Sequence, residues 1–125
     1  TTPVYLATTY RFPSAAEAAA YLDAPEGRWL YARLENPTVI AAERKIAALE
    51  GAEVAACFAS GMAAVTAALL ALVKAGDHVV AARALFGSCL YVVEELLPRF
   101  GVASTLVDGA DLAQWKAAAD KSLPT

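Results

Sequence analysis

The sequence has 125 residues and a net charge of −3, and 58% of its residues are hydrophobic while 18% are charged. This length is enough for one small domain with a core, and so large an apolar supply indicates elements that are buried on more than one face. No cluster of Lys and Arg forms a basic stripe, which argues against a nucleic-acid partner.

An uncharged run of 20 residues, 54–73, is long enough in principle to span a bilayer. Ser60-Gly61 interrupts this run at the point where a strand-like half meets a helix-like half. Alanine dominates the run and no basic loop orients it, so we expect no membrane span.

Two cysteines and one histidine bear on redox and metal chemistry. Cys57 and Cys89 lie far apart in apolar runs, which predicts buried free thiols of a reducing compartment, the cytoplasm. His78 has no second ligand residue near it in the sequence, so no metal site is expected.

The first part of the chain, residues 1–35, reads as an arm that lies on another surface. Residues 1–12 are extended in character, a short helix is possible at 15–22, and Pro25-Glu26-Gly27 predicts a turn. No strong hydrophobic period runs through the segment, so it is not expected to form a core of its own.

From Asn36 onward, residues 36–125 show regular helix and strand signals. Asn36-Pro37 opens a helix, because the asparagine side chain caps it and proline needs no N–H partner at the first position; Gly51 ends this helix. The further predicted elements, in chain order, are a buried strand over 54–59, a helix over 62–74, a strand over 78–82, a helix over 88–100 that Pro98 weakens, a strand over 102–107 and a helix over 111–119.

This order of elements predicts an α/β fold. Helices alternate with strands and are long enough for right-handed crossovers, which favours an open parallel sheet covered on both faces. The sequence stops where another strand would be due, so we expect the sheet to be incomplete.

Three short segments carry residues suited to phosphate and ring binding. Ser60-Gly61-Met62 follows the predicted strand and opens a helix, so backbone N–H groups and the positive end of a helix dipole point to one spot; a plain tight turn is the other interpretation. Tyr31 and Arg33, two apart in an extended segment, point the same way and could meet a phosphate, or could be a packed tyrosine and a surface arginine. Phe86, in the loop after the second strand, could stack on a flat ring or cap the core.

Together these segments resemble one family. The matching motifs, in order, are Tyr31-Ala-Arg33 with Asn36-Pro37-Thr38, Ala48-Leu49-Glu50-Gly51, Ala59-Ser60-Gly61-Met62, Gly76-Asp77-His78 and Phe86-Gly87-Ser88. In order and spacing they are similar to the pyridoxal-phosphate enzymes of Cys/Met metabolism, the cystathionine γ-synthase-like family. The resemblance runs from Pro3 to about Leu112.

The resemblance implies a fold-type I transferase, of which residues 1–35 are the N-terminal arm and 36–125 the first part of the large domain. It implies that Ser60, Gly61 and Met62 hold the phosphate of pyridoxal 5'-phosphate, and that Phe86 stacks on the pyridine ring. Most of the family has tyrosine where Phe86 stands. Tyr31 and Arg33 are implied to reach the phosphate in a neighbouring subunit, with Tyr31 also assisting catalysis, which means a dimer with shared sites, usually paired into a tetramer.

The implied reaction is γ-replacement on an amino-acid ester in methionine biosynthesis. Phe86-Gly87-Ser88 is most similar to the sulfhydrylases that convert O-succinylhomoserine and sulfide into homocysteine, with O-acetylhomoserine as the other ester. Methionine γ-lyases typically carry cysteine where Ser88 stands. The catalytic lysine is expected beyond Thr125, so this chain alone is expected to be inactive.

Three alternatives stay open. Within the family the chain could belong to a cystathionine γ-synthase or to a cystathionine or methionine lyase. From a different class, it could be a non-catalytic assembly fragment. A nucleotide-binding doubly wound domain would need a Gly-x-Gly-x-x-Gly turn after its first strand, which Ser60-Gly61-Met62 does not supply.

Overall fold

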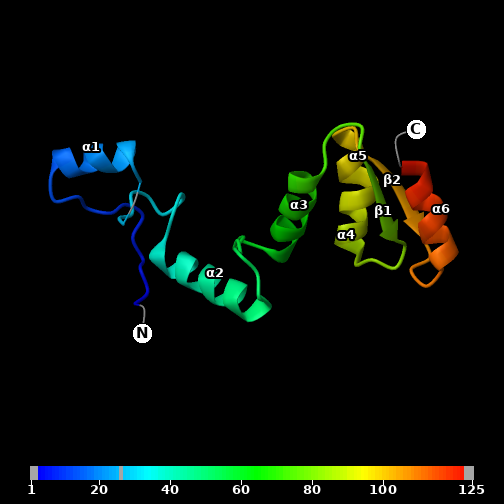
Figure 1. Cartoon of the computed structure of the whole chain (residues 1–125), viewed down its shortest axis with the longest axis horizontal. Coiled ribbons are helices and arrows are strands. Elements are labelled where there is room, and N and C mark those ends of the chain that lie inside the picture. The colour runs from blue at the N-terminus through cyan, green and yellow to red at the C-terminus, as the bar shows by residue number, and fades with distance from the viewer. Residues whose placement is uncertain (1–2, 26, 123–125) are drawn as a thin grey trace. The chain divides into compact units, whose positions relative to one another are not determined.

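The computed structural model describes residues 3–25 and 27–122. The chain divides into two compact units, Thr1–Cys57 and Phe58–Thr125. The N-terminal unit contains α1 (Ala15–Asp23) and α2 (Pro37–Glu50) (Figure 1). The C-terminal unit contains α3 (Gly61–Leu72), β1 (His78–Ala82), α4 (Gly87–Tyr91), the π-helix η1 (Val92–Leu96), α5 (Leu97–Arg99), β2 (Ala103–Val107) and α6 (Leu112–Ser122).

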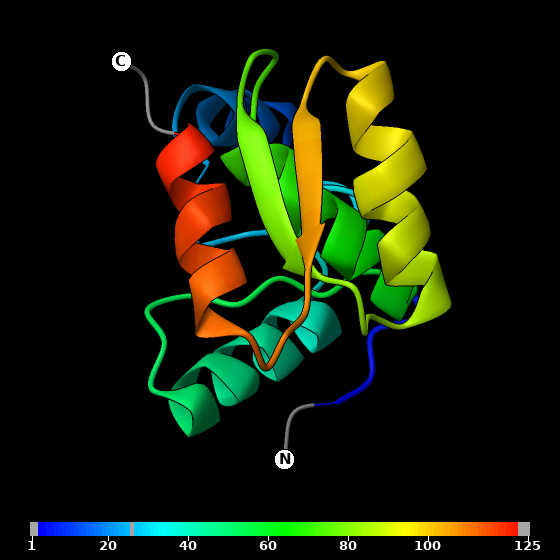
Figure 2. The same cartoon turned by 90° about the vertical axis from the view of Figure 1, so that its right-hand side faces the viewer.

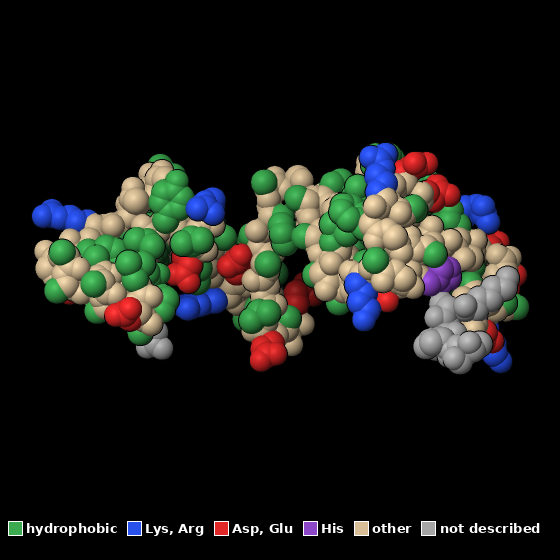
Figure 3. Space-filling model, turned by 90° about the horizontal axis from the view of Figure 1, so that it is seen from above, with side chains coloured by type: hydrophobic (Ala, Val, Ile, Leu, Met, Phe, Trp, Pro, Cys, Tyr) green, Lys and Arg blue, Asp and Glu red, His purple; other side chains and the backbone are tan. Residues whose placement is uncertain are grey.

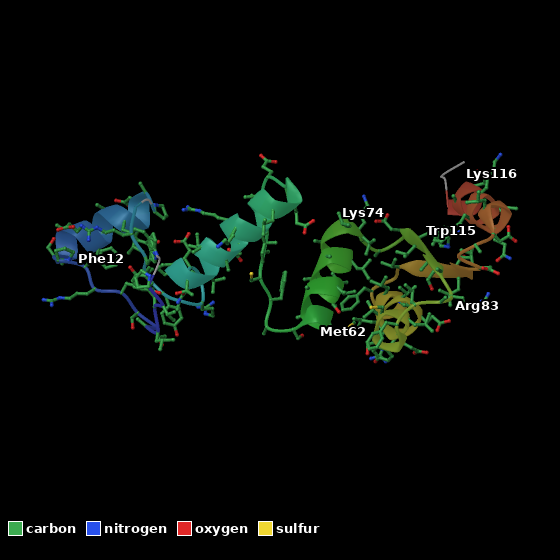
Figure 4. The ribbon with its side chains drawn as sticks, turned by 90° about the horizontal axis from the view of Figure 1, so that it is seen from below. Phe12, Met62, Lys74, Arg83, Trp115 and Lys116 are labelled. Carbon is green, nitrogen blue, oxygen red and sulfur yellow. The ribbon has the colours of Figure 1, made fainter. Side chains whose placement is uncertain are left out.

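Helix α1 confirms the short helix predicted in the arm. Ser14 caps it, because its hydroxyl accepts a hydrogen bond of 3.2 Å from the Glu17 N–H. The rings of Phe12 and Tyr21 lie 5.4 Å apart between centroids, and Arg28 pairs with Glu17 (Figure 4 labels Phe12). The predicted turn over 25–27 and the start of the arm include residues 1, 2 and 26, which lie outside the described residues.

Helix α2 begins and ends where its capping residues predict. The Asn36 Oδ1 atom accepts hydrogen bonds from the N–H groups of Thr38 (2.8 Å) and Val39 (3.4 Å). Pro37 occupies the first turn, and Gly51 ends the helix in the left-handed conformation at φ 66°. Both ends are therefore fixed by local chemistry rather than by packing.

The apolar residues of α2 recur at helical spacing and yet are not buried. Ala47 is its buried residue, while Val39, Ile46 and Leu49 are exposed, Leu49 to 80%. Figure 3 shows hydrophobic side chains at the surface of this unit. Within the described residues α2 therefore has little apolar burial, and the caps at its two ends are its visible source of stability.

In the C-terminal unit β1 and β2 form the predicted parallel pair, in register from His78 opposite Ala103 to Ala82 opposite Val107. Helix α6 lies on one face of the pair, and α3 with α4 to α5 on the other (Figures 1 and 2). The core of this unit consists of Val92, Leu97 and Val102, with Met62, Leu69, Val73, Val79 and Leu96 packed against it. The mixed α/β architecture with parallel strands is confirmed.

The strand predicted over 54–59 is wrong. A strand needs a hydrogen-bonded neighbour, and within the described residues the sheet consists of β1 and β2 alone. Val54 is 80% exposed and Phe58 48%. Cys57, predicted to be buried, lies in this unpaired segment and is exposed, and Cys89, also predicted to be buried, is only half-buried; both are free cysteines. None of the helices in the described residues combines the length and apolar character that a membrane crossing needs.

The helix predicted over 88–100 is instead three consecutive pieces, α4, η1 and α5. The Leu97 N–H bonds to the Val92 carbonyl, five residues back, which defines the wider π-turn. Pro98 follows immediately, and in an α-helix its ring would crowd the carbonyl of Glu94 and leave that oxygen without a donor. The π-turn lies where proline conflicts with α-helical geometry.

Helix α6 is capped by Asp111. Its Oδ1 atom accepts from the N–H groups of Ala113 (2.9 Å) and Gln114 (3.2 Å), and its Oδ2 atom from the Gln114 side-chain amide (3.0 Å). The backbone bond from Gln114, then its side-chain amide, then the Ala113 N–H lower the pKa of the Asp111 carboxyl from its ordinary 3.8, because each donor favours the charged form.

Candidate functional site

The N-terminus of α3 presents unused hydrogen-bond donors. Ser60 caps the helix with its Oγ atom, which accepts from the Ala63 N–H at 3.1 Å, so its hydroxyl proton stays available. The N–H groups of Gly61 and Met62 have no acceptor within the described part of the chain. Two backbone donors, a hydroxyl proton and the positive end of a 12-residue helix therefore converge on one place that suits an anion.

Gly61 keeps this place open. A Cβ atom added there would meet nothing within 4 Å, and the residue has no positive φ that would require glycine. The conformation therefore does not explain the glycine. Because Gly61 has no side chain, the space next to two backbone N–H groups is left unfilled, and a phosphate could approach them closely.

Phe86 lies in the same unit as this helix terminus, directly before a helix that contacts α3. The Cys89 Sγ atom of α4 lies 4.0 Å from the Met62 Sδ atom of α3, which places the first turns of these helices next to each other (Met62 is labelled in Figure 4). Phe86 directly precedes α4; its carbonyl accepts from the Leu90 N–H at 3.0 Å, and its side chain is 74% exposed. Phe86 thus has an exposed ring and precedes a helix whose first turn lies next to the N-terminus of α3.

Tyr31 and Arg33 lie in the N-terminal unit and were expected in an extended segment. Tyr31 forms an isolated antiparallel bridge with Thr9, and the turn that follows contains Arg33, since the Tyr31 carbonyl accepts from the N–H groups of Leu34 (2.9 Å) and Glu35 (3.0 Å). The turn still brings the pair together: the Arg33 guanidinium carbon is 5.5 Å from the centroid of the Tyr31 ring. The prediction of extended backbone therefore agrees with the bridge at Tyr31 and is wrong for Arg33, and the expected proximity of the two side chains holds through a cation–π contact.

The predicted site residues therefore form two groups. Tyr31 and Arg33 form one in the N-terminal unit, and Ser60-Gly61-Met62 with Phe86 forms the other in the C-terminal unit. Each group is assembled within its own unit by turns and helix termini. Their roles toward a ligand remain predictions.

Sequence reasoning missed a hollow at the carboxyl ends of the two strands. Arg83, Ala84, Asp108 and Gly109 line about 410 Å³ there, and the Arg83 Nη2 atom donates to the Leu106 carbonyl at 3.3 Å. A signal was available, because Arg83 and Asp108 each follow a strand directly, at the edge where parallel sheets bind ligands.

Comparison with known proteins identifies relatives over almost the whole chain. The sequence model described as Cys/Met metabolism PLP-dependent enzyme matches residues 1–123. O-succinylhomoserine sulfhydrylase of Mycobacterium tuberculosis is 48% identical over 122 residues, which are 98% of this chain and 30% of that protein. O-succinylhomoserine sulfhydrylase of Pseudomonas aeruginosa is 41% identical, over 92% of this chain and 28% of that protein.

A solved structure agrees in shape. A putative O-acetylhomoserine (thiol)-lyase of Campylobacter jejuni, which contains N'-pyridoxyl-lysine-5'-monophosphate, matches with a TM-score of 0.81 and 31% identity, over 98% of this chain and 30% of that one. The chain spans about 30% of the length of the relatives that it matches. With a family match over nearly all of its residues, the chain belongs to the Cys/Met metabolism family of pyridoxal-phosphate-dependent enzymes.

Proposed function

We propose that this chain is the N-terminal part of a cytoplasmic sulfhydrylase that uses pyridoxal 5'-phosphate to make homocysteine from O-succinylhomoserine, or O-acetylhomoserine, and sulfide. One observation carries the proposal: the N–H groups of Gly61 and Met62 have no acceptor within the described part of the chain, and Gly61 leaves the space next to them unfilled. The sulfhydrylase relatives support the choice of reaction.

The residues present fit the phosphate of this cofactor. The N–H groups of Gly61 and Met62 and the hydroxyl of Ser60 would hold phosphate oxygens, aided by the helix dipole. A phosphate dianion needs more positive charge than one helix terminus supplies, which is about half an elementary charge. Arg33, with the Tyr31 hydroxyl as a second donor, would supply it.

Phe86 would position the ring of the cofactor by stacking. Its benzyl side chain has no hydroxyl, so it can orient the ring and exclude water from one face but cannot carry a proton. When bound, the cofactor supplies an electron-withdrawing ring that stabilises negative charge on the substrate. Tyr31 is the residue of this chain with a hydroxyl suited to assist a proton transfer near the substrate.

The overall exchange is balanced without an oxidant or reductant. The bond between Cγ and the ester oxygen breaks, and the acyl group leaves as a carboxylate. The sulfur of hydrosulfide forms the new bond to Cγ and keeps its proton, which gives the thiol of homocysteine.

The proposal includes a fold-type I enzyme that is a dimer with shared sites, paired into a tetramer. In it, residues 1–35 form an arm that delivers Tyr31 and Arg33 to the neighbouring subunit, and 36–125 begin the large domain. The exposed apolar side chains of this arm, Val4, Leu6, Leu22 and Leu34 among them, support a partner surface.

The test uses the native protein that carries this sequence. Its absorbance in the near ultraviolet and visible range, with its intact mass, shows whether it retains the cofactor. Homocysteine formation is then measured with O-succinylhomoserine and with O-acetylhomoserine, each with sulfide. Homocysteine from either ester supports the proposal. Turnover only with cysteine as thiol donor would indicate a cystathionine γ-synthase, and breakdown of cystathionine or methionine a lyase. A native protein that retains no cofactor would support the alternative that the chain is a non-catalytic assembly fragment.

A further inference from the structure

Asn36 uses both ends of its side-chain amide. Its Oδ1 atom caps α2 by accepting from Thr38 and Val39, as described above. Its Nδ2 atom donates in the other direction, to the Tyr5 carbonyl and to the Tyr10 hydroxyl, each at 3.2 Å. One half-buried residue thus joins the start of α2 to the segment that precedes α1.

A second bond reinforces this join. The Tyr5 N–H donates to the Thr38 Oγ1 atom at 2.8 Å. The backbone of Tyr5 is therefore held through both its N–H and its carbonyl by the first residues at the N-terminus of α2. Side chains of α2 thus supply the hydrogen-bond partners that a neighbouring strand would supply in a sheet.

The same segment fixes the backbone around Tyr31. The Tyr10 N–H donates to the Leu30 carbonyl at 3.2 Å, and the Ala32 N–H to the Thr8 carbonyl at 2.8 Å, on either side of Tyr31. Contacts therefore run from Asn36 to Tyr10, and from Tyr10 to the turn that carries Tyr31 and its neighbour Arg33.

The choice of asparagine at this position has a physical reason. Ser, Thr and Asp cap helices about as well as Asn does. Asn alone among them offers an NH₂ group with two donors in addition to the capping oxygen. Capping therefore does not require asparagine at position 36, whereas donating to both Tyr5 and Tyr10 from the side chain that caps α2 does.

We infer that Asn36 is a positioning residue: its Nδ2 bonds to Tyr5 and Tyr10 hold the Tyr31–Arg33 pair in place for the cofactor phosphate. The inference rests on the proposed function, because it assigns a role toward that phosphate. It predicts that loss of the Nδ2 donor weakens cofactor binding although α2 stays capped.

The test compares cofactor dissociation constants in the native protein that carries this sequence, by titrating the stripped protein with pyridoxal phosphate and following its absorbance. Asn36→Asp and the uncharged Asn36→Ser both keep a capping oxygen and lose the NH₂ donors. We expect each to raise the dissociation constant about 5-fold or more, the effect of losing hydrogen bonds of ordinary net strength, while the thermal unfolding midpoint of the stripped protein falls no further than it does in Gly51→Ala. Thr38→Val should act in the same direction, and Thr38→Ser, which keeps the acceptor for Tyr5, should restore wild-type binding.

Gly51→Ala is the matched control. It strains the left-handed end of α2 at φ 66° and lowers stability without touching the bonds of Asn36. It should leave the cofactor dissociation constant unchanged. The inference is overturned if Asn36→Asp and Asn36→Ser bind the cofactor like wild type. It is also overturned if those two variants bind weakly and Gly51→Ala binds just as weakly. A wild-type protein that does not bind the cofactor overturns the proposed function instead.

Discussion

The two units of the chain are stabilised in different ways. Among the described residues, the C-terminal unit contains six of the seven buried hydrophobic side chains, Val92, Val93, Leu97, Val102, Val107 and Ala118, and the N-terminal unit only Ala47. The N-terminal unit is ordered by helix caps, a turn and hydrogen bonds between segments far apart in sequence. Apolar burial thus fixes one unit and polar geometry the other, so substitutions in the two should differ in kind.

The largest expected effect tests burial directly. Leu97 is completely buried, so Leu97→Ala should lower the free energy of unfolding by about 2–5 kcal/mol through lost transfer energy and a cavity. Leu49 of α2 is 80% exposed, so Leu49→Ala, the same chemical change in the other unit, should cost no more than about 0.5 kcal/mol. Urea denaturation of the native protein measures both. Equal losses would remove the distinction between the units.

A substitution of Arg33 tests whether this residue of the N-terminal unit serves cofactor binding rather than stability. Arg33→Lys keeps the charge but loses the forked donors, so under the proposed function it should weaken pyridoxal phosphate binding by about 1.5 kcal/mol or more, roughly tenfold. The unfolding free energy should change little because Arg33 is exposed. Cofactor titration gives the first quantity and urea denaturation the second. Arg44→Lys, at another arginine of the N-terminal unit, is the control and should bind like wild type.

A substitution of Phe86 provides the same test in the C-terminal unit. Its ring is 74% exposed, so Phe86→Ala should leave stability nearly unchanged while cofactor affinity falls by about 0.5–1.5 kcal/mol, through lost stacking. Phe86→Tyr retains a ring of the same shape and should bind like wild type. A Phe86→Ala protein with reduced stability and unchanged affinity would identify the ring as part of the core.

The sequence predicted what depends on local chemistry. Asn36, Pro37 and Gly51 set the ends of α2, and strand β1 has the predicted bounds. The sequence failed where an outcome depends on distant partners: residues 54–59 have strand composition but no neighbour to pair with within the described residues. For the site, the helix terminus at Gly61 was readable from a Ser-Gly motif. The Nδ2 bonds of Asn36 were not, because nothing in the sequence shows that Tyr5 and Tyr10 return to the start of α2.

The smallest expected effect concerns a polar cap inside the apolar unit. The Gln114 N–H, its side-chain amide and the Ala113 N–H lower the pKa of Asp111 below its ordinary 3.8. Since the folded state has the lower pKa, the carboxylate adds stability that is complete above that ordinary value and is lost as the pH falls through the lowered one. Asp111→Asn keeps an oxygen for the cap and has no charge to titrate. The free energy of unfolding of wild type minus that of this variant should therefore fall between neutral and acidic pH, with most of the fall below the ordinary pKa of aspartate. A difference that is independent of pH would mean that only the geometry of the cap contributes, and that the charge of Asp111 adds nothing in a unit held by its apolar core.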